Sequence, residues 1–187
     1  VALEAEINQE DLIQEEDMIV TVSHAGYIKR TSPSQYRAQK RGGKGLQGME
    51  AREEDWVTQL FVASTHAYVF FFSDRGKVYV KKVFEIPLAA RNAKGRAIVN
   101  LVSLEPNEKI TAIVEVPKIE AGKFVVTVTK AGQIKKTELT EYENFREKGI
   151  IGVKIEDNDR LLSAALTDGS QEFLIATQQG QSIRFPE

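Results

Sequence analysis

The feature that most constrains the fold is a short turn, placed after an apolar run, that recurs four times. Each turn begins with Ser or Thr and ends in glycine, at Ser23-His24-Ala25-Gly26, Ser73-Asp74-Arg75-Gly76, Thr129-Lys130-Ala131-Gly132 and Thr177-Gln178-Gln179-Gly180. The runs before the turns are rich in β-branched and aromatic residues, which favour strands. A short second strand follows each glycine, so each unit is predicted to open as a β-hairpin with its glycine at positive φ.

A second glycine, preceded by Lys, recurs in phase with the first. Its three copies are Gly43-Lys44-Gly45, Ala93-Lys94-Gly95 and Glu147-Lys148-Gly149. Units of about 50 residues are in the range of propeller-type blades. The chain of 187 residues is therefore predicted to be all-β, with a single repeat domain over 18–187. An acidic segment, 1–17, precedes it, and the repeat units are predicted near 18–67, 68–123, 124–171 and 172–187, the last one incomplete.

Charge is segregated along the chain, although the net formal charge is −2 and the isoelectric point is about 5.9. Residues 1–17 hold seven acids and no Lys or Arg, whereas residues 18–49 hold six bases and no acid. Residues 75–96 hold seven bases against Glu85 alone. Screening over roughly 8–10 Å makes such local clusters matter more than the whole-chain sum. Both basic stretches are candidates for binding a polyanion; the alternative is that they are solvated strand faces.

Alternation along the strands after the turns predicts where these bases point. Successive side chains of a strand lie on opposite faces, so Lys77, Tyr79 and Lys81 are predicted to share one wet, basic face, with Val78 and Val80 on the other. The candidate phosphate-contacting residues outside the densest cluster are Lys29, Arg30, Arg37, Lys77, Lys81, Lys82, Arg91, Lys94, Arg96, Lys135 and Lys136.

The densest basic cluster is the heptad Gln39-Lys40-Arg41-Gly42-Gly43-Lys44-Gly45. Glycines let the backbone approach a ligand closely, and Lys and Arg supply charge that favours phosphate. At six of seven positions the heptad resembles the box motif of the DNA-wrapping domain at the C-terminus of DNA gyrase A, with Lys40 where that motif has Arg. The likeness covers nearly the whole chain from Asp11 onward and includes the stretch from Val22 to Arg30.

This resemblance implies a β-pinwheel, in which four-stranded blades are arranged like a propeller and adjacent blades exchange a strand. It implies binding, bending and wrapping of duplex DNA without sequence preference, in support of ATP-dependent negative supercoiling by a type II topoisomerase. Gln39 to Gly45 would form the DNA-binding box, with Lys40, Arg41 and Lys44 on phosphates. The implied partners are duplex DNA, the rest of the gyrase A chain, and gyrase B in an A2B2 complex, in the bacterial cytoplasm at the nucleoid.

No catalytic residue, metal site or cofactor is expected in this chain. The Gly42-Gly43-Lys44-Gly45 stretch lacks the Ser or Thr that follows Gly-Lys in a nucleotide P-loop. The two histidines, His24 and His66, have no metal-type spacing and are expected in turns or at strand ends. Trp56 is expected in a blade core. In the family that the chain resembles, the cleavage tyrosine, ATP and Mg belong to other parts of the holoenzyme.

Composition excludes disulfides, since the chain has no Cys, and this fits a reducing cytoplasm. No apolar run of 18 residues or secretory leader is present, so no membrane association is expected. Two other functions remain open. The first is the C-terminal domain of the equivalent chain of topoisomerase IV, in which the box tends to be degraded. The second is a propeller-like protein-interaction module without DNA binding, which the acidic isoelectric point would suit.

Overall fold

The computed structural model describes residues 9–36 and 55–187, and in these ranges every regular element is a strand or a short 3-10 turn. The chain divides into two compact units. The first unit contains Val1–Val69 and Lys81–Leu104, and the second contains Phe70–Val80 and Glu105–Glu187. No helix in the described ranges has the length and apolar character needed to span a bilayer.

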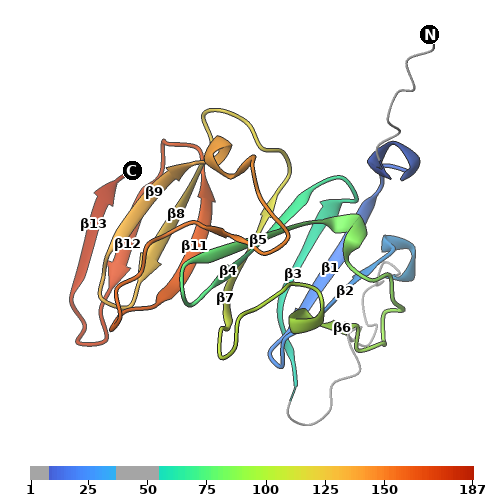
Figure 1. Cartoon of the computed structure of the whole chain (residues 1–187), viewed down its shortest axis with the longest axis horizontal. Helices are drawn as coiled ribbons and strands as arrows, with labels where there is room; N and C mark the ends of the chain where they lie inside the picture. Colours follow the sequence, from blue (N-terminus) through green and yellow to red (C-terminus); the bar gives the residue numbers. More distant parts are fainter. Residues whose placement is uncertain (1–8, 37–54) are drawn as a thin grey trace, which may run out of the picture. The chain divides into compact units, whose positions relative to one another are not determined.

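The first unit holds one antiparallel sheet of four strands, ordered β3-β1-β2-β6 (Figure 1). Its strands are β1 (Asp17–Ser23), β2 (Tyr27–Thr31), β3 (Val57–Ser64) and β6 (Arg96–Ala97). The 3-10 turns of this unit are η1 (Gln9–Leu12), η2 (Pro33–Gln35), η3 (Val83–Glu85) and η4 (Ile98–Asn100).

The other strands lie wholly or mostly in the second unit and form three sheets, ordered β10-β5-β4-β7, β11-β8-β9 and β12-β13. Their bounds are β4 (Tyr68–Ser73), β5 (Lys77–Lys82), β7 (Ile110–Val116), β8 (Phe124–Thr129), β9 (Ile134–Glu138), β10 (Ile150–Ile151), β11 (Leu161–Thr167), β12 (Glu172–Ala176) and β13 (Ser182–Pro186). One 3-10 turn, η5 (Leu139–Tyr142), follows β9. The all-β, four-stranded architecture predicted from the sequence is confirmed. The predicted bounds of the repeat units stay a prediction.

All four predicted hairpins are present, as β1–β2, β4–β5, β8–β9 and β12–β13. The turn glycines Gly26, Gly76, Gly132 and Gly180 have φ of 82°, 78°, 85° and 80°. In every turn the glycine N–H donates to the carbonyl of the Ser or Thr three residues before it, at 3.0 Å. The hydroxyl of that same Ser or Thr accepts the N–H of the residue after the glycine, at 3.2 Å. The repeated Ser or Thr is therefore part of the turn and caps its second strand.

Strand exchange between repeats, which the resemblance implied, is also present. The two-residue strand β6 follows β5 in sequence but pairs with β2, with Ile28 opposite Arg96. In the same way β10 pairs with β5, with Val78 opposite Ile150. Each exchanged strand thus covers the outer edge of a hairpin that belongs to the preceding repeat.

The aromatic strand β4 forms the centre of the core in the second unit. Phe70, Phe71 and Phe72 are all fully buried. The rings of Phe70 and Phe72 meet the edge of Tyr142 at centroid distances of 5.3 and 6.4 Å. Three consecutive buried residues show that both faces of this strand are covered, since neighbouring side chains point to opposite faces.

The predicted wet, basic face of β5 is wrong, because Tyr79 is buried in place of facing water. Its hydroxyl donates to Glu108 at 2.7 Å. Its ring lies against the loop before β10, so close that a Cβ added to Gly149 would stand 2.8 Å from it. The exchange covers a face that simple alternation assigns to solvent.

Candidate nucleic-acid interface

The predicted box, Gln39 to Gly45, and the predicted contact Arg37 lie in 37–54, outside the described residues. Their assignment as DNA-binding residues stays a prediction. The structure does describe the flanks of this stretch, up to Tyr36 and from Asp55, and all the other predicted basic residues.

Lys29 is fully buried, so the prediction that it lies on an exposed basic face is wrong. Its Nζ donates to the carbonyls of Ala90 at 3.1 Å and Ala93 at 2.8 Å, and also contacts the carbonyl of Arg91. Burial, and then the charge of Arg91, lowers the pKa of Lys29. The side chain uses all three of its donors on backbone oxygens and presents none to a ligand.

Arg30, the next residue, is half-buried and also binds backbone. Its Nε donates to the carbonyl of Ile86 at 2.7 Å. Burial lowers the pKa of Arg30, while the carboxylate of Glu16 acts in the opposite direction. The backbone of Arg30 bonds the same stretch, since its N–H donates to the carbonyl of Pro87 and its carbonyl accepts from Ala89, both at 3.0 Å. This arginine therefore contributes to holding the chain that leads to β6.

Four of the predicted contacts pair with carboxylates. The pairs are Lys77 with Glu105 at 3.1 Å, Lys81 with Glu85 at 3.2 Å, Lys82 with Glu10 at 3.1 Å, and Lys136 with Glu187 at 3.2 Å. Another predicted contact, Lys135, donates to the carbonyl of Gly152 at 2.9 Å. Ion pairs near the surface contribute only about 0–1 kcal/mol, so a phosphate can replace the exposed carboxylates of Glu105 and Glu85 at little cost. The carboxylate of Glu187 is buried, so its pair with Lys136 is not of this kind.

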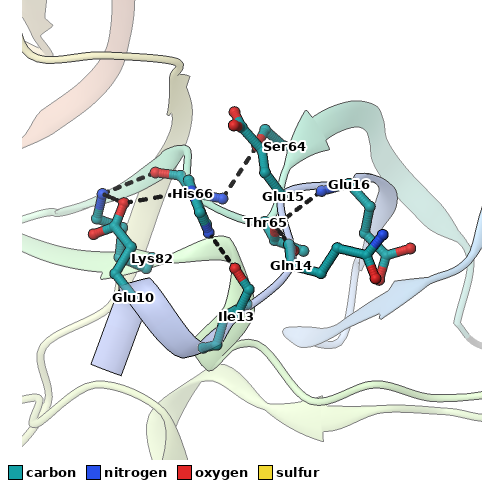
Figure 2. A network of polar contacts seen from close by, with 9 residues as sticks. All are labelled: Glu10, Ile13, Gln14, Glu15, Glu16, Ser64, Thr65, His66 and Lys82. Carbon is teal, nitrogen blue, oxygen red and sulfur yellow. Dashed lines mark hydrogen bonds and ion pairs between the residues drawn. The ribbon is translucent and has the colours of Figure 1, made fainter. Parts of the chain in front are cut away.

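The pair at Lys82 belongs to a larger contact made by residues 9–16, here called the strap (Figure 2). The strap lies along the turn between β3 and β4. There Thr65 donates from its hydroxyl to the carbonyl of Gln14 at 2.8 Å, and His66 Nε2 bonds the carbonyl of Ile13 at 2.8 Å. The Nζ of Lys82 also donates to the carbonyl of His66 and lies over the ring of Tyr68. The described part of the acidic segment is thus bound to the first unit.

Three of the predicted contacts gather on residues 89–98, here called the exchanged segment, which contains β6. Arg96 and Lys94 are exposed, and Lys94 Nζ lies 3.8 Å from the ring centroid of Tyr27. Arg91 donates its backbone N–H to Gln35 Oε1 at 2.9 Å, and its Nη1 has no hydrogen-bond partner within the part of the chain that the structure describes. Gln35 lies two residues before the undescribed stretch 37–54, so this segment contacts the described residues that directly precede the heptad's stretch. Within the described part of the first unit, Lys94 and Arg96 are exposed cations that form no ion pair with a carboxylate.

Sequence reasoning missed an acid that stabilises the hairpin turns. Asp55 Oδ1 accepts the N–H of Ala25 at 2.9 Å, and Asp159 Oδ1 accepts the N–H of Ala131 at 2.8 Å. Glu108 holds the same place in its repeat and instead accepts the Tyr79 hydroxyl. All three acids stand two residues before a strand, β3, β7 or β11. That common position was the available signal.

The turns depress the pKa values of these acids. Burial alone would raise the pKa of Asp55, but hydrogen bonds from the Ala25 N–H, the Ser23 hydroxyl and the Trp56 N–H outweigh it and lower the pKa. For Asp159 the Thr129 hydroxyl is the largest cause of the lowered pKa. The carboxylates are therefore bound as anions by the repeated hydroxyl and by turn N–H groups, and they have a structural role.

The placement of Trp56 also differs from the prediction. Its side chain is 55% exposed, not in a blade core. The indole stacks on His24 with ring centroids 4.0 Å apart. Both histidines lie in turns, as predicted: His24 between β1 and β2, and His66 between β3 and β4.

The sequence matches the family model described as "DNA gyrase C-terminal domain, beta-propeller" over residues 17–64, 67–117, 123–168 and 171–187. The gyrase A protein of Clostridium acetobutylicum is 45% identical over 184 residues, which cover 98% of this chain and 22% of the relative. The gyrase A protein of Escherichia coli K12 is 46% identical over 183 residues, which cover 98% of this chain and 21% of the relative. The chain thus spans about a fifth of the length of these relatives.

Solved structures agree in fold. The C-terminal domain of DNA topoisomerase IV superposes with a TM-score of 0.77 at 28% identity, covering 93% of this chain and 53% of that one. The DNA gyrase A C-terminal domain superposes with a TM-score of 0.67 at 26% identity, covering 91% of this chain and 55% of that one.

Proposed function

The chain belongs to the family of the DNA gyrase C-terminal domain, and we propose that it binds and wraps duplex DNA as the C-terminal domain of a gyrase A protein. The remainder of that protein, together with gyrase B, ATP and Mg, would supply strand cleavage and the energy for supercoiling. In this proposal the chain acts on chromosomal DNA in the cytoplasm.

The observation that carries the proposal furthest is the basic surface of the first unit. The exchanged segment presents Lys94 and Arg96 with no carboxylate of the described residues paired to either. The undescribed stretch 37–54, which holds the heptad, starts two residues after Gln35, and Gln35 bonds this segment. Lys81 forms a surface ion pair with Glu85 that phosphate can replace. Such a surface suits contacts to the DNA backbone, which position a duplex without reading its bases.

Binding is tested by titrating duplexes of unrelated sequence at several salt concentrations. Each neutralised phosphate contributes about −0.9 to the slope of log K against log salt. We expect similar affinity for all sequences and a slope that corresponds to several phosphates. A chain that shows no binding to duplex DNA at low salt would support the protein-interaction alternative and overturn the proposal.

Wrapping is tested at the box. Bending a duplex by 40–90° over 20–30 base pairs costs roughly 1–6 kcal/mol by elastic estimates, and contacts where the curve closes must offset this cost. Changing Lys40, Arg41 and Lys44 together to Ala in the parent enzyme should abolish negative supercoiling, while most of the duplex affinity remains. The matched control changes Lys118, Lys130 and Lys154, which are exposed and outside the predicted interface. Normal supercoiling by the box variant would overturn the role of the box.

Topoisomerase IV is the second candidate for the parent enzyme, because the fold superposes on its C-terminal domain with the higher TM-score of the two structures. The near-complete heptad and the gyrase A relatives at 45–46% identity favour gyrase. The two parents are separated by topoisomer gels of the holoenzyme: a gyrase introduces negative supercoils with ATP, whereas a topoisomerase IV only relaxes or decatenates.

A further inference from the structure

Lys29 is the only lysine of the described residues whose side chain is completely buried. An isolated buried ammonium is strongly unfavourable unless its donors are satisfied. Here the carbonyls of Ala90, Arg91 and Ala93 converge on Nζ, and all three lie on the exchanged segment. The lysine therefore joins β2 of one repeat to a loop of the next repeat, through charge-assisted hydrogen bonds.

Apart from the pairing of β6 with β2 at Arg96 and Ala97, the exchanged segment has few other anchors among the described residues. At one end Ala89 donates to Arg30, and at the other end Ile98 donates to the carbonyl of Gly26 at 2.9 Å. Between them the Thr31 hydroxyl bonds the carbonyl of Ala89 at 3.0 Å, and Gln35 accepts the N–H of Arg91. Without the ammonium, the carbonyls of Arg91 and Ala93 would lose this donor and that of Ala90 would keep only the N–H of Ala93, so the loop that carries Arg91 and Lys94 would tend to open.

The position of Lys29, the third residue after the turn glycine, can be compared between repeats. Lys135 is also the third residue after its turn glycine, but it is exposed and its strand β9 has no exchanged partner among the described residues. In the second repeat the position is Tyr79, which is buried against the loop before β10. A buried residue at this position thus accompanies an exchanged strand, and an exposed one accompanies an open edge.

We propose that Lys29 is a positioning residue, which latches the exchanged segment onto β2 so that its cations face outward as one surface. The cations so oriented are Lys94 and Arg96, both of which are exposed. The part of the proposal that concerns DNA rests on the proposed function, whereas the latch itself does not.

The test compares Lys29→Met with Lys135→Met in the full chain. Both variants remove one positive charge from the same repeat position, and Met preserves most of the side-chain volume. Amide hydrogen exchange of residues 89–98 should be at least about tenfold faster in Lys29→Met, as expected when hydrogen bonds to a charged group are lost and the loop opens locally. Lys135→Met should leave exchange in 89–98 unchanged.

A bend measurement by energy transfer between the ends of a labelled duplex gives the second readout. Lys29→Met should reduce the bend while changing affinity by less than about threefold, since Lys29 contacts no phosphate and non-specific affinity is shared among many bases. The matched Lys135→Met should lower affinity slightly and keep the bend.

Chemical rescue separates a latch from a packing residue. In Lys29→Ala, added butylammonium should restore slow exchange in 89–98, because an amine can enter the carbonyl cluster, whereas butanol should not. If Lys29→Met does not fold, Lys29→Gln retains N–H donors and serves as the second variant.

The outcomes distinguish the latch from the proposed function. Unchanged exchange in 89–98 for Lys29→Met, or an equal change for Lys135→Met, overturns the latch whatever the DNA results are. A wild-type chain that binds no DNA overturns the proposed function and the orientation of cations toward DNA, while the latch is still decided by exchange and rescue. An altered exchange with a normal bend would show that the latch does not position the DNA-binding surface.

Discussion

The hairpins β1–β2 and β8–β9 have the same turn and the same spacing, but their outer edges differ. The edge of β2 is covered by β6, whereas β9 has no further strand among the described residues. Two residues after the turn glycine, Ile28 is fully buried while Ile134 is 38% exposed. One position later, Lys29 is buried and Lys135 is exposed. Burial at these positions is therefore decided by a segment of the next repeat and not by the hairpin.

This difference decides whether a basic residue of such a repeat faces solvent or is buried between repeats. On the open edge Lys135 is exposed to solvent and bonds a single carbonyl, that of Gly152, whereas on the covered edge Lys29 is buried and becomes part of the joint between repeats. Counting the bases on the strands consequently overestimates the phosphate-binding surface of the covered hairpins.

The largest effect that tests the comparison is expected from truncating the paired isoleucines. Ile28→Ala removes a fully buried side chain and should lower the free energy of unfolding by about 3–4 kcal/mol. Ile134→Ala removes a partly exposed one and should cost less than about 1 kcal/mol. Urea unfolding of both variants measures the two values. Equal losses would mean that the edge of β9 is covered in solution.

A smaller effect is expected at the turn glycines, which have nearly equal φ. A Cβ on Gly76 would overlap the carbonyl oxygen of Val153, beside the exchanged strand β10, whereas one on Gly132 would meet nothing within 4 Å. Gly132→Ala should cost about 1–2 kcal/mol for the left-handed backbone alone. Gly76→Ala should cost roughly 1–3 kcal/mol more, for the overlap. Denaturant midpoints of the matched pair give the difference, and a Gly132 variant as damaged as the Gly76 variant would contradict this account.

The acids of the turns should make both hairpins alike in their pH dependence. The folded-state pKa values of Asp55 and Asp159 are lowered. Their contribution to stability is therefore present above the unfolded pKa of about 3.9 and is lost as the pH falls through the lower folded value. Asp55→Asn and Asp159→Asn should each destabilise the chain near pH 7, and the difference from the wild type should shrink as the pH falls below about 3.9. The measurement is the free energy of unfolding against pH. A difference that does not shrink at any pH below about 3.9 would show that the charge is not what stabilises the turn.

The smallest effect requires no substitution. Amides of residues 27–31 should exchange with solvent more slowly than those of residues 134–138, because the former strand has a neighbour on each edge and the latter on one. Peptide-level deuterium uptake at neutral pH measures this. Uptake that is equal in the two segments would remove the basis of the comparison.

Much of the fold could be predicted from the sequence because the signals are local. A β-rich run followed by Ser or Thr and a glycine defines each hairpin through its own backbone, so all four turn glycines were placed correctly. The exchanged strands could be expected only from the family resemblance, since two residues such as Arg96–Ala97 carry no periodicity. Lys29 and Tyr79 were assigned to solvent for the same reason: what covers them comes from a distant part of the chain. Trp56 was expected in a core because it directly precedes an apolar run, whereas its partner His24 comes from a turn 32 residues earlier in the chain.

The strap also has a mechanical consequence. Its bonds follow one another in chain order, from Glu10 with Lys82, through the carbonyls of Ile13 and Gln14, to Glu16, whose carbonyl accepts the N–H of Thr65 at 2.9 Å. A force that pulls the residues before Gln9 away from the turn would break these bonds one after another. It would act on β1 only after the last bond has broken. The strap would thus bear such a force first, before the β-sheet of the first unit.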